Sequence, residues 1–108
     1  MKKDTIIELL GLALENKSET TTEYPFEIGK SYFIRSATYH CTGKVKAIQS
    51  HFLVLEDAAW IADSGRFNEA INDGKLSEVE PVNVEMGVNI DSIIDYFEWK
   101  HKLPREIK

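Results

Sequence analysis

The sequence predicts an α+β protein, mainly β, that forms a small antiparallel barrel with an N-terminal helix and a short inserted helix. Between residues 31 and 58, three segments rich in β-branched and aromatic side chains follow one another with tight connections. Segments near the N-terminus and after residue 64 instead show helical spacing of apolar side chains. The length of 108 residues fits one domain with one core.

The N-terminal segment 1–23 is predicted to be an amphipathic helix and a flexible linker. Thr5 and Glu8 form a capping-box pattern at the start of the helix, which covers residues 5–14. Its apolar face comprises Ile6, Ile7, Leu9, Leu10, Ala13 and Leu14. A helix of this length is marginal alone, so this face must dock on the domain or on a partner. The rest of the segment has a linker composition, and the body follows as residues 24–108.

The body begins with a predicted meander of three strands. These strands cover residues 31–39, 44–49 and 52–58. Thr42-Gly43 precedes the second strand, and Ser50-His51 makes a tight turn before the third. Connections this short require antiparallel neighbours, because a parallel crossover needs about a dozen residues or more.

A short helix, about 64–73, is expected after the meander. Ser64 can cap its start, and Gly74 can end it in the left-handed conformation. The inner face of this helix comprises Phe67, Ala70 and Ile71.

Alternating apolar and polar side chains in residues 79–84 predict a further strand. Val82 and Val84 would form its buried face. Pro81 cannot donate a hydrogen bond to a neighbouring strand, so this strand should lie at an edge or begin there.

The segment 89–99 fits either a helix or a strand. A helix would be capped by Asp91, whereas a strand would place Phe97 and Trp99 on one face and turn Asp95 inward. We favour the strand, because the β-branched and aromatic content is high and the barrel otherwise lacks a closing strand. The tail 100–108 is expected to be extended.

The charges are unevenly distributed along the chain. The net charge is −5, yet residues 28–48 carry four basic side chains and no acidic one. A globally acidic chain is a poor general binder of nucleic acid, because phosphate contacts dominate that affinity. The basic strand pair could still hold a short anionic ligand, or attract the acidic strands of a neighbouring subunit.

The compartment is predicted from the single cysteine and the short apolar runs. Cys41 cannot form an internal disulfide, which is consistent with a reducing compartment. No apolar run is long enough to span a bilayer. We therefore expect a cytoplasmic protein with no membrane partner.

Aromatic and basic side chains supply the candidates for ligand binding. Trp60 could form a stacking pocket with Tyr39, Phe52 and Arg66, or it could cover the core with Arg66 stacked on it. We favour the core interpretation. The candidate binding residues are Arg35, Tyr39, Lys44, Lys46, Trp60 and Arg66.

No spacing of polar residues predicts a catalytic, metal or cofactor site. His40 and Cys41 are adjacent, so in a strand they point to opposite faces and form neither a nucleophile pair nor a ligand pair with His51. The carboxylates of Asp57 and Asp63 are interpreted as turn caps or partners of Arg66. We expect no enzyme activity, no metal and no cofactor.

Several motifs resemble short, uncharacterised proteins encoded by phages and prophages. The resemblance covers about residues 25–106 and is carried by Gly29-Lys-Ser-Tyr-Phe-Ile-Arg35, Thr42-Gly-Lys-Val45, Phe52-Leu-Val-Leu-Glu-Asp-Ala-Ala-Trp-Ile-Ala-Asp-Ser-Gly-Arg-Phe67, Glu78-Val-Glu-Pro81 and Leu103-Pro-Arg-Glu106. It implies a phage origin, and hence the cytoplasm of the host cell, but no assigned activity.

The meander is also similar in shape to the first motif of Sm-like proteins, including Hfq. Gly43 would let the second strand curve, as a glycine does in a bent strand. This similarity implies a small Sm/SH3-like barrel that assembles by pairing edge strands into a homo-oligomer. The helix inserted before residue 79 and the poor match to the second Sm motif depart from that pattern.

Two functions follow as expectations. The first is a non-enzymatic phage accessory protein that self-assembles and binds a host component or a small anionic ligand, with a role against bacterial defence as one form. The alternative is an Sm-like module for RNA or single-stranded nucleic acid, in which Arg35, Lys44 and Lys46 would contact phosphates.

Overall fold

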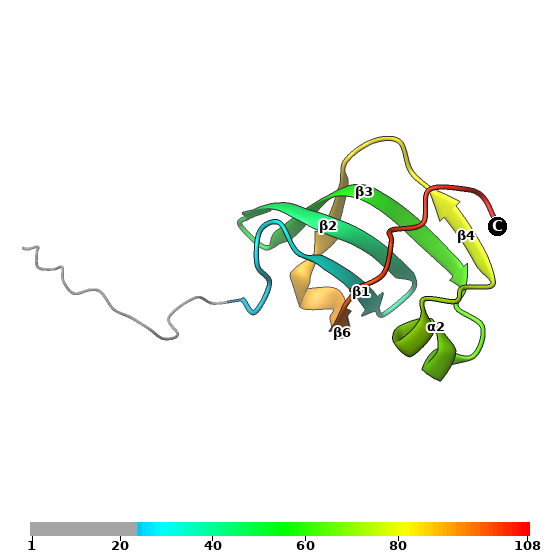
Figure 1. Ribbon diagram of the computed structural model, residues 1–108. Coiled ribbons are helices and arrows are strands. Elements are labelled where there is room, and N and C mark those ends of the chain that lie inside the picture. Colours follow the sequence, from blue (N-terminus) through cyan, green and yellow to red (C-terminus); the bar gives the residue numbers. More distant parts are fainter. Residues whose placement is uncertain (1–23) are drawn as a thin grey trace, which may run out of the picture.

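The computed structural model describes residues 24–108 of the chain (Figure 1). The predicted N-terminal helix 5–14 and its linker lie outside the described residues. The elements, in order, are β1 (Ser31–Ser36), β2 (His40–Gln49), β3 (Phe52–Asp63), α2 (Phe67–Asp73), β4 (Glu78–Pro81), β5 (Met86–Asn89), the 3₁₀ helix η1 (Ile90–Ser92) and β6 (Ile93–Glu98). The predicted class, mainly β with a short inserted helix in the body, is confirmed.

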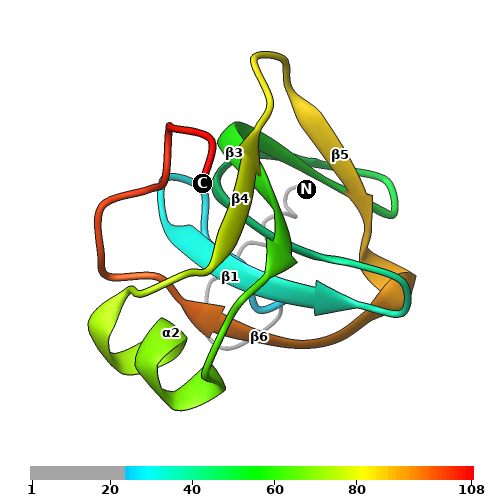
Figure 2. The same ribbon diagram turned by 90° about the vertical axis from the view of Figure 1, so that its right-hand side faces the viewer.

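The strands form one antiparallel sheet (Figure 2). Neighbouring strands follow the order β4-β3-β2-β1-β6, and β5 pairs with β3. β3 is long enough for two partners on one edge, since residues 52–55 pair with β5 and residues 59–63 pair with β4. β5 continues through η1 into β6, which pairs with β1. The predicted antiparallel meander β1–β2–β3 is confirmed.

The boundary between β1 and β2 differs from the prediction. β1 ends at Ser36 rather than at residue 39, and β2 begins at His40 rather than at residue 44. The backbone N–H and the hydroxyl of Ser36 both donate to the Tyr39 carbonyl, each at 2.8 Å, and close a turn here. Thr42-Gly43 therefore lies inside β2, where it pairs with β1.

A bulge at Asp57 makes β3 longer than the predicted strand 52–58. Asp57 adopts a left-handed backbone conformation, with φ at 53°, and the register with β2 shifts beside it. Because of the extra residue, Leu55 and Ala58 belong to the same core cluster although they are three positions apart. The strand therefore continues through its charged corner to Asp63 instead of ending there.

The start of α2 is corrected by the structure. Arg66, not Ser64, is the N-cap residue, and its side chain makes no capping hydrogen bond. The turn before the helix is instead fixed by Asp63, whose Oδ1 accepts a hydrogen bond from the Gly65 N–H at 2.8 Å. Gly74 ends α2 in the left-handed conformation, with φ at 73°, as predicted.

The predicted strand 79–84 is wrong in its second half. β4 ends at Pro81, and the buried side chain is Val79, whereas Val82 and Val84 are exposed. Val79 packs in the cluster beneath α2. Beyond Pro81 the chain makes one more hydrogen bond to β3, from the Val82 N–H to the Ala58 carbonyl at 2.9 Å, and then bows away. The edge position predicted for Pro81 is confirmed.

The strand interpretation of residues 89–99 is confirmed for β6, which η1 precedes. Asp95 does lie on the same face of β6 as Phe97, which was the objection to a strand. Its charge is matched by Arg35, the residue directly opposite on β1. The cross-strand ion pair with Arg35 therefore stabilises the Asp95 carboxylate at this half-buried position.

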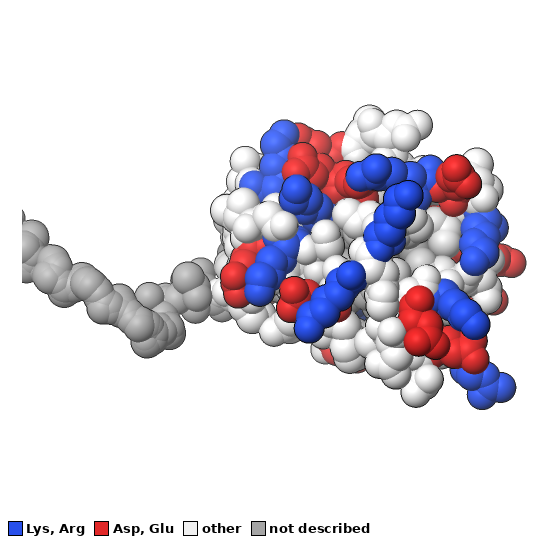
Figure 3. Space-filling model, in the orientation of Figure 1, with Lys and Arg blue, Asp and Glu red and all other residues white. Residues whose placement is uncertain are grey.

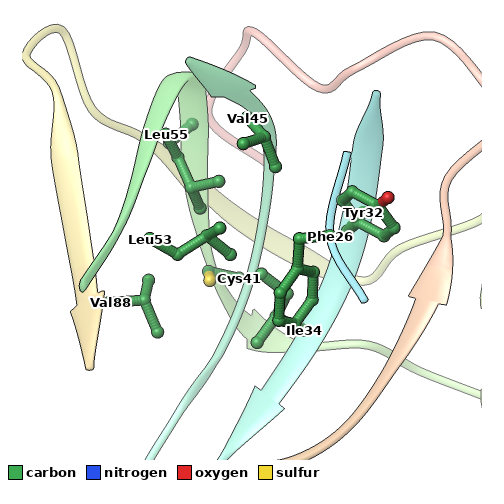
Figure 4. Close-up of a cluster of buried hydrophobic side chains, with 9 residues drawn as sticks. Phe26, Tyr32, Ile34, Cys41, Val45, Leu53, Leu55 and Val88 are labelled. Carbon is green, nitrogen blue, oxygen red and sulfur yellow. The ribbon is translucent and has the colours of Figure 1, made fainter. Parts of the chain in front are cut away.

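Two apolar clusters lie on opposite faces of the sheet. One comprises Phe26, Tyr32, Ile34, Cys41, Val45, Leu53, Leu55, Ala58 and Val88, and its side chains converge between the strands in Figure 4. The other comprises Phe33, Ala59, Ile61, Ala70, Leu76, Val79 and Trp99. β1 contributes to both, because Tyr32 and Ile34 point to one face and Phe33 to the other. β1 is thus covered on both of its faces.

Thr42 offers a test of this packing. Among the described residues, its hydroxyl oxygen is buried without a hydrogen-bond partner. Thr42→Val keeps the shape of the side chain and removes this unsatisfied group, so the free energy of unfolding should rise by about 1 kcal/mol. Urea denaturation of both proteins would measure the change. A loss of stability would mean that the hydroxyl has a partner in solution.

Candidate functional site

An apolar groove lies where β3, β4 and β5 meet. It has a volume of about 470 Å³ and is open to solvent. We call it the Trp60 groove. It is lined by Tyr39, Trp60, Val82, Val84, Glu85, Met86 and Gly87. One hypothesis from the sequence is a stacking pocket that contains Tyr39 and Trp60. In the structure both residues line this groove.

Trp60 is more exposed to solvent than the core interpretation favoured from the sequence implies. Its side chain is 45% exposed. The bulge at Asp57 puts Trp60 on the same face of β3 as Ala58, beside the cluster that contains Ala58 and Cys41. Trp60 pairs with Cys41 on β2 and with Glu80 on β4, so backbone pairing on both sides holds it in place.

The loop between β4 and β5 supplies the other wall of the groove. Both strands pair with β3, but residues 82–85 between them do not continue the ladder. Val82 and Val84 project from this loop as exposed apolar side chains. The alternation of apolar and polar residues predicts that both are buried, whereas the structure exposes both in the groove. Met86 at the start of β5 completes this wall.

Carboxylates dominate the polar rim of the groove. Glu80 lies directly across from Trp60 on β4, and Glu85 lines the groove itself. Lys46 donates a hydrogen bond to Glu85, which raises the pKa of the Lys46 ammonium group. Burial, followed by the proximity of Cys41, raises the pKa of Tyr39 and keeps its phenol neutral near pH 7. The rim therefore has more acidic than basic groups.

Arg35 lies on the other face of the sheet, away from the Trp60 groove. Its Nε donates to Asp95 Oδ1 at 2.7 Å, and its Nη2 donates to Asp95 Oδ2. These hydrogen bonds lower the pKa of Asp95. The ring of Phe67 covers the guanidinium, with 4.7 Å between the Arg35 Cζ and the ring centroid. Arg35 is therefore committed to a contact between β1, β6 and α2.

The remaining basic candidates are not gathered around the groove. Lys44 is exposed on β2 and lies opposite Glu56, and Arg66 is exposed at the start of α2. Neither lines the groove. Of the six candidates, the structure brings Tyr39 and Trp60 together, with Lys46 at the rim through Glu85.

The predicted roles of the carboxylates are only partly met. Asp63 caps its turn, as described above, but Asp57 pairs with Arg105 of the C-terminal tail rather than with Arg66. The Arg105 guanidinium makes three hydrogen bonds to the Asp57 carboxylate, at 2.6 to 3.0 Å.

Burial raises the pKa of the Cys41 thiol to about 12, so the thiol remains protonated.

Within residues 24–108, no group of three or more histidine, cysteine or acidic side chains could hold a metal ion. In the same part of the chain, no helix has the length and apolar character needed to cross a membrane. The chain matches no protein-family model, and neither curated proteins nor solved structures show a significant similarity to it. The groove and its surroundings therefore carry the functional argument.

Proposed function

We propose that this chain is a non-enzymatic binding protein that recognises a protein partner through the Trp60 groove. The observation that carries the proposal is the exposed position of Trp60, fixed by backbone pairing on both sides, in a continuous apolar surface. Single exposed apolar side chains are common, but a contiguous patch with an aromatic centre is typical of an interaction site. Glu80 at the rim, across from Trp60, favours a partner that carries a basic group.

The resemblance to phage-encoded proteins leads us to propose a host component as this partner, and interference with bacterial defence as one outcome. We further propose that the sheet closes as a small Sm/SH3-like barrel. The order of the strands supports it, since β1, β2, β3 and β5 are successive neighbours and β6 follows η1 back to β1.

Self-assembly through an edge strand is also part of the proposal. The Lys108 backbone exchanges two hydrogen bonds of 3.0 Å with Val79 and so covers part of the outer edge of β4. Within the described residues, no strand pairs with the outer edge of β6, which leaves that edge for a second copy. Light scattering tests this part, because a strictly monomeric species at micromolar concentration would exclude it.

A nucleic acid or small anionic ligand has less support. Arg35 and Lys46 each contact a carboxylate, so their charge is already compensated. Basic and acidic side chains are interspersed on the face of the molecule in Figure 3, without a continuous basic stripe. Filter binding of a labelled short RNA at low salt would decide, because low salt favours phosphate contacts.

Trp60→Ala should remove partner binding while leaving the fold intact. Immobilised protein would be used to capture partners from a bacterial host lysate, and the affinity of the captured partner would then be measured. Loss of a central aromatic side chain should weaken binding by on the order of tenfold or more. Phe52→Ala is the matched control, since Phe52 is 48% exposed on the same strand but does not line the groove. Equal binding by the wild-type protein and Trp60→Ala would refute the proposal.

A further inference from the structure

The outer edge of β6 carries unpaired main-chain groups at two positions. The backbone N–H of Trp99 donates to the Ser31 carbonyl at 2.8 Å, so Trp99 forms a hydrogen-bonded pair with the start of β1. Because such pairs alternate along an antiparallel ladder, Phe97 also bonds to β1. The N–H and C=O groups of Tyr96 and Glu98 therefore point away from the sheet. Among the described residues, no strand pairs with them.

A bulge limits this free edge at its N-terminal side. Arg35 pairs with Asp95 and Ser36 pairs with Ile93, so Ile94 is an extra residue of β6 without a partner on β1. A bulge at a sheet edge twists the strand away from a neighbour and so opposes further pairing. The part of the edge that can accept another strand is therefore short and begins after Ile94.

The face of β6 at the centre of this short edge is aromatic. Phe97 is half-buried and packs edge-on against Phe67, with ring centroids 5.3 Å apart. Phe67 itself remains 38% exposed. The Phe67 ring also covers the guanidinium of Arg35, which pairs with Asp95. The charges beside Phe97 are thus compensated within the chain, and an aromatic surface reaches the edge of the sheet.

A second copy of β6 fits this edge in one antiparallel register. Two-fold pairing about Phe97 joins the free groups, because Tyr96 of one copy then faces Glu98 of the other. A two-fold axis at Asp95 or at Glu98 would set two identical carboxylates directly opposite each other, which is destabilising. An axis at Tyr96 would pair Glu98 with the bulged Ile94. The register centred on Phe97 avoids both faults.

We propose that two copies of this chain pair along β6 as a two-fold dimer with Phe97 at the axis. Two pairs of Tyr96 with Glu98 supply about four main-chain hydrogen bonds, and the two Phe97 rings meet across the axis. The backbone of Lys108 covers part of the outer edge of β4, so β6 is the more open of the two edges. This dimer is a specific form of the self-assembly proposed above and depends on it. It leaves the Trp60 groove of each copy free, because that groove is built from β3 and the loop between β4 and β5.

Disulfide trapping in the full-length protein tests this register. A mixture of Tyr96→Cys and Glu98→Cys proteins should form a mixed disulfide dimer under mild oxidation, because facing residues of a hydrogen-bonded pair have Cα atoms about 5.5 Å apart. Either protein alone should form about tenfold less dimer, since identical positions are then diagonal neighbours about 7–8 Å apart. Mass spectrometry would identify the mixed dimer. Cys41 does not interfere, because it is buried and its pKa is raised to about 12.

Ile94→Cys is the matched control on the same strand. Ile94 is 70% exposed against 39% for Tyr96, so random collisions would cross-link Ile94→Cys most readily. In the proposed dimer the two Ile94 positions are offset along the strands by about 20 Å and cannot be bridged. Cross-linking of Ile94→Cys as fast as that of the mixture would overturn the proposal.

Light scattering of the wild-type protein separates this interface from self-assembly in general. An oligomer accompanied by the mixed disulfide is the expected result. An oligomer without the mixed disulfide would overturn the β6 interface and leave self-assembly to another surface. A protein that stays monomeric at micromolar concentration would overturn both.

Discussion

Replacement of Phe33 by alanine should lower the free energy of unfolding by about 3–5 kcal/mol. Phe33 is fully buried at the centre of the cluster beneath α2. Its ring stacks on Trp99, with 5.9 Å between centroids, and meets the edge of Phe67 at 6.5 Å. Truncation removes these contacts and leaves a cavity that β1, held by hydrogen bonds to β2 and β6, cannot collapse to fill.

Urea denaturation would measure this effect as a lower midpoint at an unchanged slope. Phe52→Ala provides the control, because it removes the same atoms from a half-exposed position and should cost less than about 1 kcal/mol. Similar losses for Phe33→Ala and Phe52→Ala would contradict the described packing. They would show that solvent reaches both rings to the same extent.

Gly43→Ala should destabilise the protein by about 2 kcal/mol, although it adds only one methyl group. An added Cβ would lie 2.9 Å from both Cβ and Cδ1 of Leu55 and 3.3 Å from Cβ of Ala58. Those atoms belong to a packed cluster, and the Leu55 Cβ cannot rotate away from the new methyl group. The substitution must therefore separate β2 from β3 beside the bulge at Asp57.

Gly87→Ala is the matched control for this substitution. Gly87 also lies in a strand, β5, but the nearest atom to its added Cβ is Phe52 Cδ1 at 3.8 Å, an ordinary van der Waals distance. Its replacement should change the stability by less than about 1 kcal/mol and can be stabilising, because alanine has less chain entropy to lose. Thermal unfolding of the two variants would compare them. Equal effects would show that Leu55 does not press on Gly43.

Local signals in the sequence were sufficient for much of the sheet. The Ser50-His51 turn predicted the β2–β3 hairpin, and Gly74 marked the end of α2. The position of Trp60 could not be predicted in this way. It depends on the bulge at Asp57, where one extra residue moves each later side chain of β3 to the opposite face. Simple alternation of apolar and polar residues does not reveal such a bulge.

The candidate site shows the same limit for charges. Arg35 in a basic stretch of sequence suggested anion binding, but its partner Asp95 is 60 residues away and becomes a neighbour only through the pairing of β1 with β6. The alternation in residues 79–84 does identify Val82 and Val84 as an apolar pair. Their exposure in the Trp60 groove follows from the point at which β4 leaves β3, which the alternation alone does not mark.

The contrast between the two tryptophans gives this chain an intrinsic pair of optical reporters. Trp99 is 4% exposed against Phe33, whereas Trp60 faces solvent in the groove. Indole emission from Trp60 should lie at longer wavelength and be quenched by iodide, while emission from Trp99 should resist quenching until the sheet opens. One emission spectrum would therefore separate occupation of the groove from loss of the fold, without any added dye.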